Sequence, residues 1–341
     1  MIKIIINFII LSIVPFISKV FKDKKILLNQ SGDKHQKFAS ISNVPLIGGA
    51  FILISYILLF YNNNVYFSIF TIFIFLTGIL SDTKKINSPY FRIGLQILVL
   101  IITIRFLNIE IYNTRVLFLD ELLNNKMFNI IFVIFCILIL INGTNFIDGL
   151  NGLALGYYIS ISFILIFFCN EKNIFFDFDN SKYFLATLAI LLIYNFFNKL
   201  FLGDSGAYLL GLIYGLHLIN YYTLNMHISP FFIIVLLWYP CFELLFSIIR
   251  KFNINKSPVN PDARHFHQLL FFYVRKKFFY DKLISNNLSS LLIIIYNFLI
   301  FYLASTNLSS SEYQIMIILI SVLIYSILYT KLLKFRILYK K

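Results

Sequence analysis

Residues 126–154 read KMFNIIFVIFCILILINGTNFIDGLNGLA, an apolar run that ends in a string of amide and acidic side chains. The apolar part, residues 127–142, contains no charged residue. A helix that crosses the hydrocarbon core of a bilayer needs about 20 predominantly apolar residues. The stretch therefore predicts a transmembrane helix that extends into the polar residues at its end.

Similar apolar runs recur along the whole chain, which has 341 residues, of which 60% are hydrophobic and 13% are charged. Soluble proteins carry roughly 25% charged residues, so the bilayer is the expected solvent. We predict an all-α integral membrane protein, a single polytopic domain over residues 1–341 with about eleven transmembrane helices. The predicted spans are 2–20, 45–61, 65–80, 91–107, 127–142, 152–169, 183–199, 204–220, 229–249, 289–306 and 313–333.

The basic residues predict the orientation of the spans. The chain has 29 Lys and Arg residues against 15 Asp and Glu, a formal net charge of +14. With the N-terminus outside and the C-terminus in the cytoplasm, most of these cations face the cytoplasm, as the positive-inside rule requires. The outer side keeps Lys3, Arg105, Arg115, Lys126, Lys172 and Lys182. Basic charge spread over short loops faces anionic lipid, so we expect membrane lipids and no nucleic acid as partners.

The connecting segments carry weaker signals. Residues 251–288 form the longest loop and are expected to be cytoplasmic. The outer loop at 107–126 alternates apolar and polar residues around Asn113-Thr114, a pattern typical of a short β-hairpin. No A-x-A-like cleavage site follows the first run, so we expect it to be retained as a helix.

Four clusters of polar residues lie where the apolar runs end, and the predicted topology puts all four on the cytoplasmic face. Ionisable groups at a membrane boundary are costly and usually mark a site. The clusters are Asp82; Asn142, Asn145 and Asp148; Asp204, within Phe201-Leu202-Gly203-Asp204-Ser205-Gly206; and Asp262, His265 and His267.

Each cluster also has a purely structural interpretation. Asp82 would pair with Lys85, although an acid at a helix C-terminus opposes the helix dipole. The asparagines of the second cluster would bond neighbouring helices, Asp204 would cap its helix, and the histidines would be solvated loop residues. The site disappears only if all of these interpretations hold together.

The residue types fit a diphosphate substrate and a hard cation. Mg²⁺ takes carboxylate and phosphate oxygens as ligands, and Gly203 and Gly206 permit close approach of the backbone beside Asp204. The N-terminus of a helix adds partial positive charge, and imidazoles can donate to phosphate oxygens or carry protons. We predict Mg²⁺ as the cofactor, with Mn²⁺ as the alternative ion. The cations available for phosphates are Lys84, Lys85, Lys199 and Arg264.

One further acid, Glu243, lies inside the run 229–249, seven residues before Arg250 and therefore on the same helix face. We expect it to form a hydrogen bond to a neighbouring helix, with a sugar contact as the alternative.

The motifs resemble those of the polyprenyl-phosphate N-acetylhexosamine-1-phosphate transferase family. The resemblance rests on NGTNFIDGLNGLA (142–154), FLGDSGAYLLG (201–211) and PDARHFHQLL (261–270), and it extends from Val44 over nearly the whole chain. The histidine motif is closer to the branch that initiates O-antigen and teichoic acid synthesis than to the peptidoglycan branch. Two departures stand out: Ser81 replaces an acid that often precedes Asp82, and the histidine motif, which often has two adjacent histidines, reads His265-Phe266-His267-Gln268 here.

The resemblance implies roles for particular residues. The candidate catalytic residues are Asp82, Asp148, His265 and His267. Asn145 is a candidate substrate-binding residue by the same resemblance, and the chemistry and position of five further residues make them candidates too: Lys84, Lys85, Asn142, Lys199 and Arg264. The candidate metal ligands are Asp204 and Asp148.

The resemblance also implies an activity at the cytoplasmic face of the bacterial inner membrane. The expected reaction transfers N-acetylhexosamine 1-phosphate from a UDP-sugar to undecaprenyl phosphate, releases UMP and initiates a cell-envelope glycan. The alternatives are a phospho-N-acetylmuramoyl-pentapeptide transferase, a secondary transporter and an inactive scaffold. The transporter is disfavoured because no internal repeat is visible. The sugar and the oligomeric state are left open, with a homodimer as one alternative.

Overall fold

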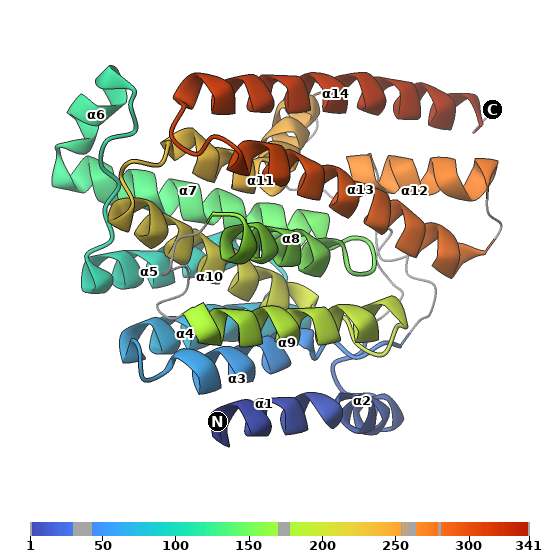
Figure 1. The fold of residues 1–341 in the computed structure, drawn as a ribbon. Helices are drawn as coiled ribbons and strands as arrows, with labels where there is room; N and C mark the ends of the chain where they lie inside the picture. The colour runs from blue at the N-terminus through green and yellow to red at the C-terminus, as the bar shows by residue number, and fades with distance from the viewer. Residues whose placement is uncertain are drawn as a thin grey trace.

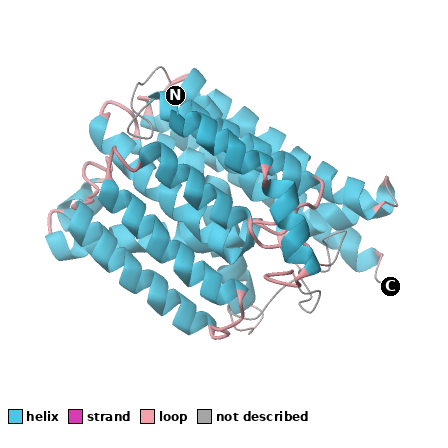
Figure 2. Cartoon of the chain, turned by 90° about the horizontal axis from the view of Figure 1, so that it is seen from below, coloured by secondary structure: helices cyan, strands magenta, loops and turns pink. Residues whose placement is uncertain are grey.

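The computed structural model describes residues 2–29, 43–169, 178–253, 255, 257, 264–278 and 281–339. Helices joined by loops make up this part of the chain (Figure 2), and its single β-bridge, between Leu28 and Pro45, is isolated. The helices are α1 (Ile2–Ser12), α2 (Val14–Asp23), α3 (Gly48–Phe60), α4 (Val65–Asp82), α5 (Pro89–Leu107), α6 (Leu117–Leu123), α7 (Lys126–Ile147), α8 (Leu153–Phe167), α9 (Phe178–Phe196), α10 (Gly203–Leu224), α11 (Pro230–Phe252), α12 (Phe266–Lys277), α13 (Lys282–Ser305) and α14 (Ser311–Leu338). The predicted all-α class is confirmed.

Six helices are long and apolar enough to cross a membrane, namely α4, α5, α7, α11, α13 and α14. The predicted span 2–20 is a pair of helices bent by 41°, which would make a seventh crossing if the pair is one span. The remaining predicted spans coincide with helices α3, α8, α9 and α10, which are shorter or less apolar. The helices are those of a multi-pass membrane protein, while the count of about eleven crossings stays a prediction.

The helices run side by side in a bundle, with α1 and α2 at one edge and α14 at the other (Figure 1). Helix α10 is the centre of this bundle and packs chiefly against α4, α7 and α3. Its residues from Ser205 to Leu218 are all buried. A helix that is buried on every face needs no lipid-facing surface, which explains why α10 is less apolar than the outer helices.

Two glycines allow the start of α10 to approach α4. A Cβ at Gly78 of α4 would collide with the backbone of Ser205, so only glycine permits this crossing. Gly203 has φ +72°, and a Cβ there would lie 2.6 Å from Oδ2 of Asp82. The end of α4 and the start of α10 are therefore in direct contact.

The predicted hairpin in the outer loop is wrong. Residues Leu117–Leu123 form the short helix α6, and no strand forms between 107 and 126. In a hairpin, the backbone of Ile111 would form hydrogen bonds with a partner strand. In the structure it forms them with the side chain of Asn129. Its Oδ1 accepts from the Ile111 N–H at 3.0 Å, and its Nδ2 donates to the Ile111 carbonyl at 2.8 Å.

The two loops of interest lie at opposite ends of the bundle. Figure 1 shows α6 at the left end and α12, which follows the histidine motif, at the right end. The N-terminus lies at the left end of α1 and the C-terminus at the right end of α14. This arrangement agrees with an odd number of crossings, whereas the side that faces the cytoplasm stays a prediction.

Candidate functional site

Asp82, the last residue of α4, binds the first turn of α10. Its Oδ1 accepts from the backbone N–H of Asp204 at 2.7 Å, and its Oδ2 accepts from the N–H of Ser205 at 3.1 Å. The first N–H groups of a helix have no partner within the helix, and a carboxylate there is also favoured by the helix dipole. Asp82 therefore fixes the segment that carries Asp204.

Asp204 is held by three side chains from three other helices. Its Oδ2 accepts from the Ser81 hydroxyl at 2.5 Å and from Nη1 of Arg92 at 3.2 Å, and its Oδ1 accepts from Nδ2 of Asn145 at 2.7 Å. Nη1 of Arg92 also donates to Ser81 at 2.9 Å. The side chains of Arg92 and Asp204 are 29% and 27% exposed, so a ligand can reach them.

Arg92 reaches Asp204 because of how α5 begins. Ser88 is the N-cap of α5, with its hydroxyl 3.5 Å from the N–H of Phe91, and Pro89 occupies the first helical position. Proline is favoured there because its fixed φ suits the helix and its missing N–H needs no partner. Arg92 consequently lies in the first turn of α5, beside the end of α4.

Asp148 ends α7 on the same side of the bundle as Asp82 and Asp204. Burial raises the pKa of its carboxyl well above the usual range, and the charges of Asp204 and Asp82 raise it further. The three carboxylates are therefore close enough to repel one another, and a cation or a proton among them would be stabilised.

Asn142 and Asn145 form hydrogen bonds with different partners. Asn145 contacts Asp204, as described above. Asn142 donates to Oε1 of Gln96 in α5 at 2.8 Å and to the carbonyl of Leu138 at 2.9 Å. The structure favours interhelical hydrogen bonding as the role of Asn142.

The histidine motif lies against the end of α7. The ring of His265 packs edge-on against Phe146 with centroids 5.0 Å apart, and it stacks on His267 at 5.7 Å. A Cβ at Gly149 would collide with the His267 ring. The ring therefore lies against Gly149, the residue that follows Asp148. The second and fourth predicted clusters are thus brought together, except that Asp262 lies outside the described residues.

His267 is buried and neutral. Burial, and to a smaller extent the neighbouring His265, lowers its pKa to about 3. Neither ring nitrogen has a hydrogen-bond partner among the described residues. A buried imidazole without partners is costly, so a ligand that reaches these nitrogens would be stabilised.

The predicted phosphate-binding cations lie at the surface of the bundle. The side chains of Lys84, Lys85, Lys199 and Arg264 are exposed. The carbonyl of Arg264 accepts from Nη1 of Arg250 at 2.6 Å, which anchors the histidine motif through its backbone. A role of these four side chains toward substrate phosphates stays a prediction.

The donor set fits a hard cation that is shared with a substrate. No group of three or more His, Cys, Asp or Glu side chains among the described residues is close enough to hold a metal alone. Mg²⁺ in proteins is usually bound by one or two carboxylates and completes its shell with water and substrate phosphates. Asp204 and Asp148 supply oxygen atoms of this kind, and their mutual repulsion would be relieved by a dication.

Sequence reasoning missed two contacts of the site. No pattern in the sequence singles out Arg92 among the basic residues, yet it is the cation bonded to Asp204. Glu243 was expected to bond a neighbouring helix, and this is confirmed by Tyr325 of α14, whose hydroxyl donates to Oε2 at 2.6 Å. Its second partner, His265, was not expected.

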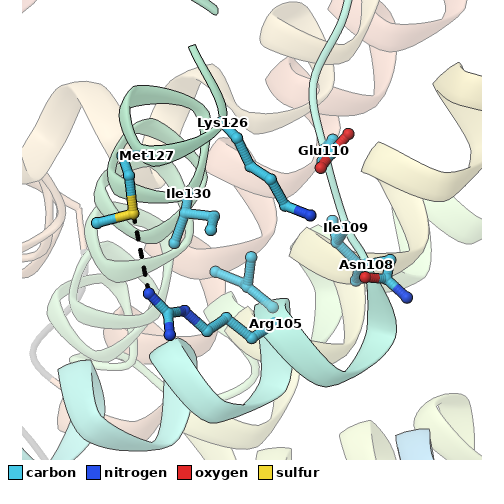
Figure 3. Close-up of a pocket in the computed structure, with 8 residues that line it drawn as sticks. Arg105, Asn108, Ile109, Glu110, Lys126, Met127 and Ile130 are labelled. Atoms are coloured by element: carbon cyan, nitrogen blue, oxygen red, sulfur yellow. Dashed lines mark hydrogen bonds between the residues drawn. The ribbon is translucent and has the colours of Figure 1, made fainter.

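The hollow of about 310 Å³ in Figure 3 lies elsewhere. It is formed where α5 ends and α7 begins, and none of the predicted site residues lines it. Arg105, Lys126 and Glu110 project at its edge (Figure 3), and Arg105 is 3.8 Å from the sulfur of Met127. These residues belong to the opposite ends of α5 and α7 from Arg92 and Asp148, so the hollow is separate from the acid cluster.

Comparison with known proteins finds a family model that matches the central segment of the chain. Residues 64–222 match the family described as Glycosyl transferase family 4. This segment contains Asp82, Asp148 and Asp204 and ends before the histidine motif.

Three relatives illustrate the similarity. The chain is 26% identical over 227 residues to an undecaprenyl-phosphate alpha-N-acetylglucosaminyl 1-phosphate transferase of Thermotoga maritima, covering 66% of this chain and 67% of the relative. It is 26% identical over 288 residues to a Bacillus subtilis protein named "Probable undecaprenyl-phosphate N-acetylglucosaminyl 1-phosphate transferase", covering 80% and 78%. It is 30% identical over 179 residues to a phospho-N-acetylmuramoyl-pentapeptide-transferase of Dictyoglomus thermophilum, covering 50% and 57%.

Proposed function

From the match of residues 64–222 to the glycosyl transferase family 4 we propose that the chain transfers a sugar 1-phosphate from a nucleotide sugar to a polyprenyl phosphate. The observation that carries the proposal is the acid cluster: Asp82 binds the backbone of Asp204, Asp204 binds Arg92, and the charges of both acids act on Asp148. Carboxylates at such a boundary are costly unless they serve a site. A reaction between a lipid phosphate and a water-soluble diphosphate needs a site at that boundary.

The proposed reaction is a displacement at phosphorus. An oxygen of the polyprenyl phosphate forms a bond to the β-phosphorus of the UDP-sugar, and the bond from that phosphorus to the bridging oxygen breaks. UMP leaves, and the product is a polyprenyl-pyrophosphate sugar. A phosphate monoester has a second pKa near 6, so the attacking oxygen is mostly ionised at neutral pH. The protein must therefore mainly align the reactants and neutralise charge.

The residues divide between these two tasks. Asp204 and Asp148 would hold Mg²⁺, which supplies charge neutralisation at the diphosphate when it is bound. Arg92, Ser81 and Asn145 fix the carboxylate of Asp204. Asp82 fixes the backbone that carries it.

The names of two relatives support a finer proposal for the substrates. The Thermotoga maritima and Bacillus subtilis relatives are named for undecaprenyl phosphate and N-acetylglucosamine, so we propose UDP-N-acetylglucosamine or a related UDP-N-acetylhexosamine as donor. We further propose that the acid cluster faces the cytoplasm at the bacterial inner membrane, because the basic residues favour that orientation.

An assay of UMP release from a panel of donors tests the proposal. Purified protein in lipid, given undecaprenyl phosphate and Mg²⁺, should release UMP with UDP-N-acetylglucosamine or a related UDP-N-acetylhexosamine. Release only with UDP-N-acetylmuramoyl-pentapeptide would assign the chain to the peptidoglycan reaction. No release with any donor, together with solute counterflow in proteoliposomes, would assign it to the transporters.

A further inference from the structure

The carboxylate of Glu243 is a buried charge that the proposed chemistry does not yet use. It lies inside α11 with 1% of its surface exposed. A carboxylate at such a position is costly unless several donors satisfy it. Three donors do so, and two of them belong to the start of the histidine motif.

The contacts of Glu243 join three helices. Its Oε1 lies 3.0 Å from Nδ1 of His265 and accepts from the backbone N–H of Phe266 at 3.2 Å. Its Oε2 accepts from the hydroxyl of Tyr325 at 2.6 Å. Glu243 thus ties the beginning of α12 to α11 and α14, which Figure 1 shows on the same side of the bundle.

These contacts determine which nitrogen of His265 carries the proton. The donors Phe266 N–H and Tyr325 O–H favour the ionised form of the Glu243 carboxylate, and an ionised carboxylate can only accept hydrogen bonds. The contact of Oε1 with His265 therefore requires the proton on Nδ1. Nε2 is then the nitrogen left for a ligand.

The ring of His265 is also fixed on its other sides. Phe146 packs against it edge-on at 5.0 Å, and His267 stacks on it with an angle of 8° between the rings. Phe146 lies two residues before Asp148. A rotation of the His265 ring would consequently break the contact to Glu243 and disturb the packing next to the acid cluster.

We propose that Glu243 is a positioning residue, which holds His265 in its Nδ1–H form and presents Nε2 toward the substrate. The proposal rests on the proposed function in one respect, namely that His265 serves the phosphoryl transfer. A carboxylate behind an imidazole fixes its tautomer and orientation. At metal-ligating histidines the loss of such a partner typically costs about 10–100-fold in metal affinity or activity, and we expect a loss of the same order in turnover here.

The test combines a spectroscopic measurement with turnover. The chain has 5 histidines, so uniform ¹⁵N-histidine labelling gives few signals, and a His265→Gln sample assigns those of His265. Three variants are compared with the unaltered protein. Glu243→Met removes both acceptors, Glu243→Gln keeps an oxygen acceptor, and Tyr325→Phe removes only the donor to Oε2 and serves as the matched control.

In the unaltered protein, the ¹⁵N shifts should show His265 protonated at Nδ1. In Glu243→Met this signature should disappear, and turnover should fall by about 10–100-fold. Glu243→Gln should keep the signature and recover part of the turnover, and Tyr325→Phe should stay within about threefold of the unaltered protein because the His265 contact remains.

Three results would overturn the proposal: protonation at Nε2 in the unaltered protein, an unchanged signature in Glu243→Met, or an equal loss of turnover in Tyr325→Phe. If Glu243→Met does not fold, the ¹⁵N signature of the unaltered protein and the behaviour of Glu243→Gln still test the proposal. If the unaltered protein shows no turnover, the proposed function fails, while the ¹⁵N shifts still test the role of Glu243.

Discussion

The carboxylate of Asp82 accepts the backbone N–H of Asp204 at 2.7 Å, so one candidate site residue fixes the position of another. The two acids come from helices α4 and α10 and are far apart in the sequence. This contact means that a substitution of Asp82 acts on the geometry of Asp204 as well as on charge. Variants of Asp82 must therefore separate these two effects.

Asp82→Asn and Asp82→Ala make this separation. The alanine variant loses both acceptors of the α10 cap, so its free energy of unfolding should fall by about 0.5–2 kcal/mol. The asparagine variant keeps one acceptor and should lose less stability. Both should lose most of their turnover, because the amide lacks the charge that organises the cation.

Rate measurements at two pH values and two Mg²⁺ concentrations check this prediction. We expect the loss in Asp82→Asn to persist at pH 9 and to be partly relieved by excess Mg²⁺. Recovery at pH 9 without dependence on Mg²⁺ would instead identify Asp82 as a base that activates the lipid phosphate.

Ser81→Asp should increase the apparent affinity for Mg²⁺. Ser81 Oγ lies 2.5 Å from Asp204 and 2.9 Å from Arg92, so an acid at this position adds negative charge directly beside the candidate metal ligand. A dication relieves the repulsion between two carboxylates. The Mg²⁺ concentration at half-maximal rate should therefore fall, and Ser81→Ala, which adds no charge, is the control. An unchanged Mg²⁺ dependence in Ser81→Asp would place the cation elsewhere.

Gly78→Ala should destabilise the protein, whereas Gly94→Ala should not. A Cβ at Gly78 would collide with the backbone of Ser205, which cannot rotate away. Overpacking of this kind costs about 1–3 kcal/mol in the free energy of unfolding. A Cβ at Gly94 meets nothing within 4 Å, and alanine in a helix is favoured over glycine by up to about 1 kcal/mol.

Thermal unfolding of the two glycine variants in detergent gives the comparison. Turnover should fall in Gly78→Ala, because the start of α10 carries Asp204. Equal stability of the two variants would mean that α4 and α10 do not cross as closely as the structure has them.

Cysteine labelling tests the orientation of the bundle. In a variant that lacks the native Cys136, Cys169 and Cys241, a cysteine at Asn113 should react with an impermeant reagent from outside intact cells. A cysteine at the exposed Lys277 should react only after the cells are opened. The reverse pattern would put the acid cluster on the outer side, away from cytoplasmic nucleotide sugars.

The sequence was sufficient to predict the all-α class and to expect Asp82 and Asp204 at the same end of the helices. Apolar runs of spanning length predict helices in any fold, and acids at the ends of such runs stand out against lipid. Asp82 and Asp204, for example, were expected at one face, and the structure brings them into direct contact. Their hydrogen bonds depend on how α4 crosses α10, which no local pattern contains.

The same reason explains what the sequence could not predict. Glu243 and His265 are separated by a loop, and their contact depends on where α12 packs. Arg92 is one of many cations near helix ends, and only the start of α5 beside α4 gives it Asp204 as a partner. The alternating pattern near Ile111 predicted a strand, because a pattern cannot show that Asn129 supplies the hydrogen bonds instead.

The fate of the β-phosphorus tests the central claim most directly. Membranes that contain the protein, undecaprenyl phosphate and Mg²⁺ are incubated with UDP-N-acetylglucosamine labelled with ³²P at the β-phosphate, and the lipid extract is counted. We predict that the label enters the lipid together with the sugar, that unlabelled UMP is released, and that Asp204→Asn membranes give only background. Label that stays in water-soluble UDP while the sugar enters the lipid would contradict the account, because the protein would then transfer the sugar without its phosphate.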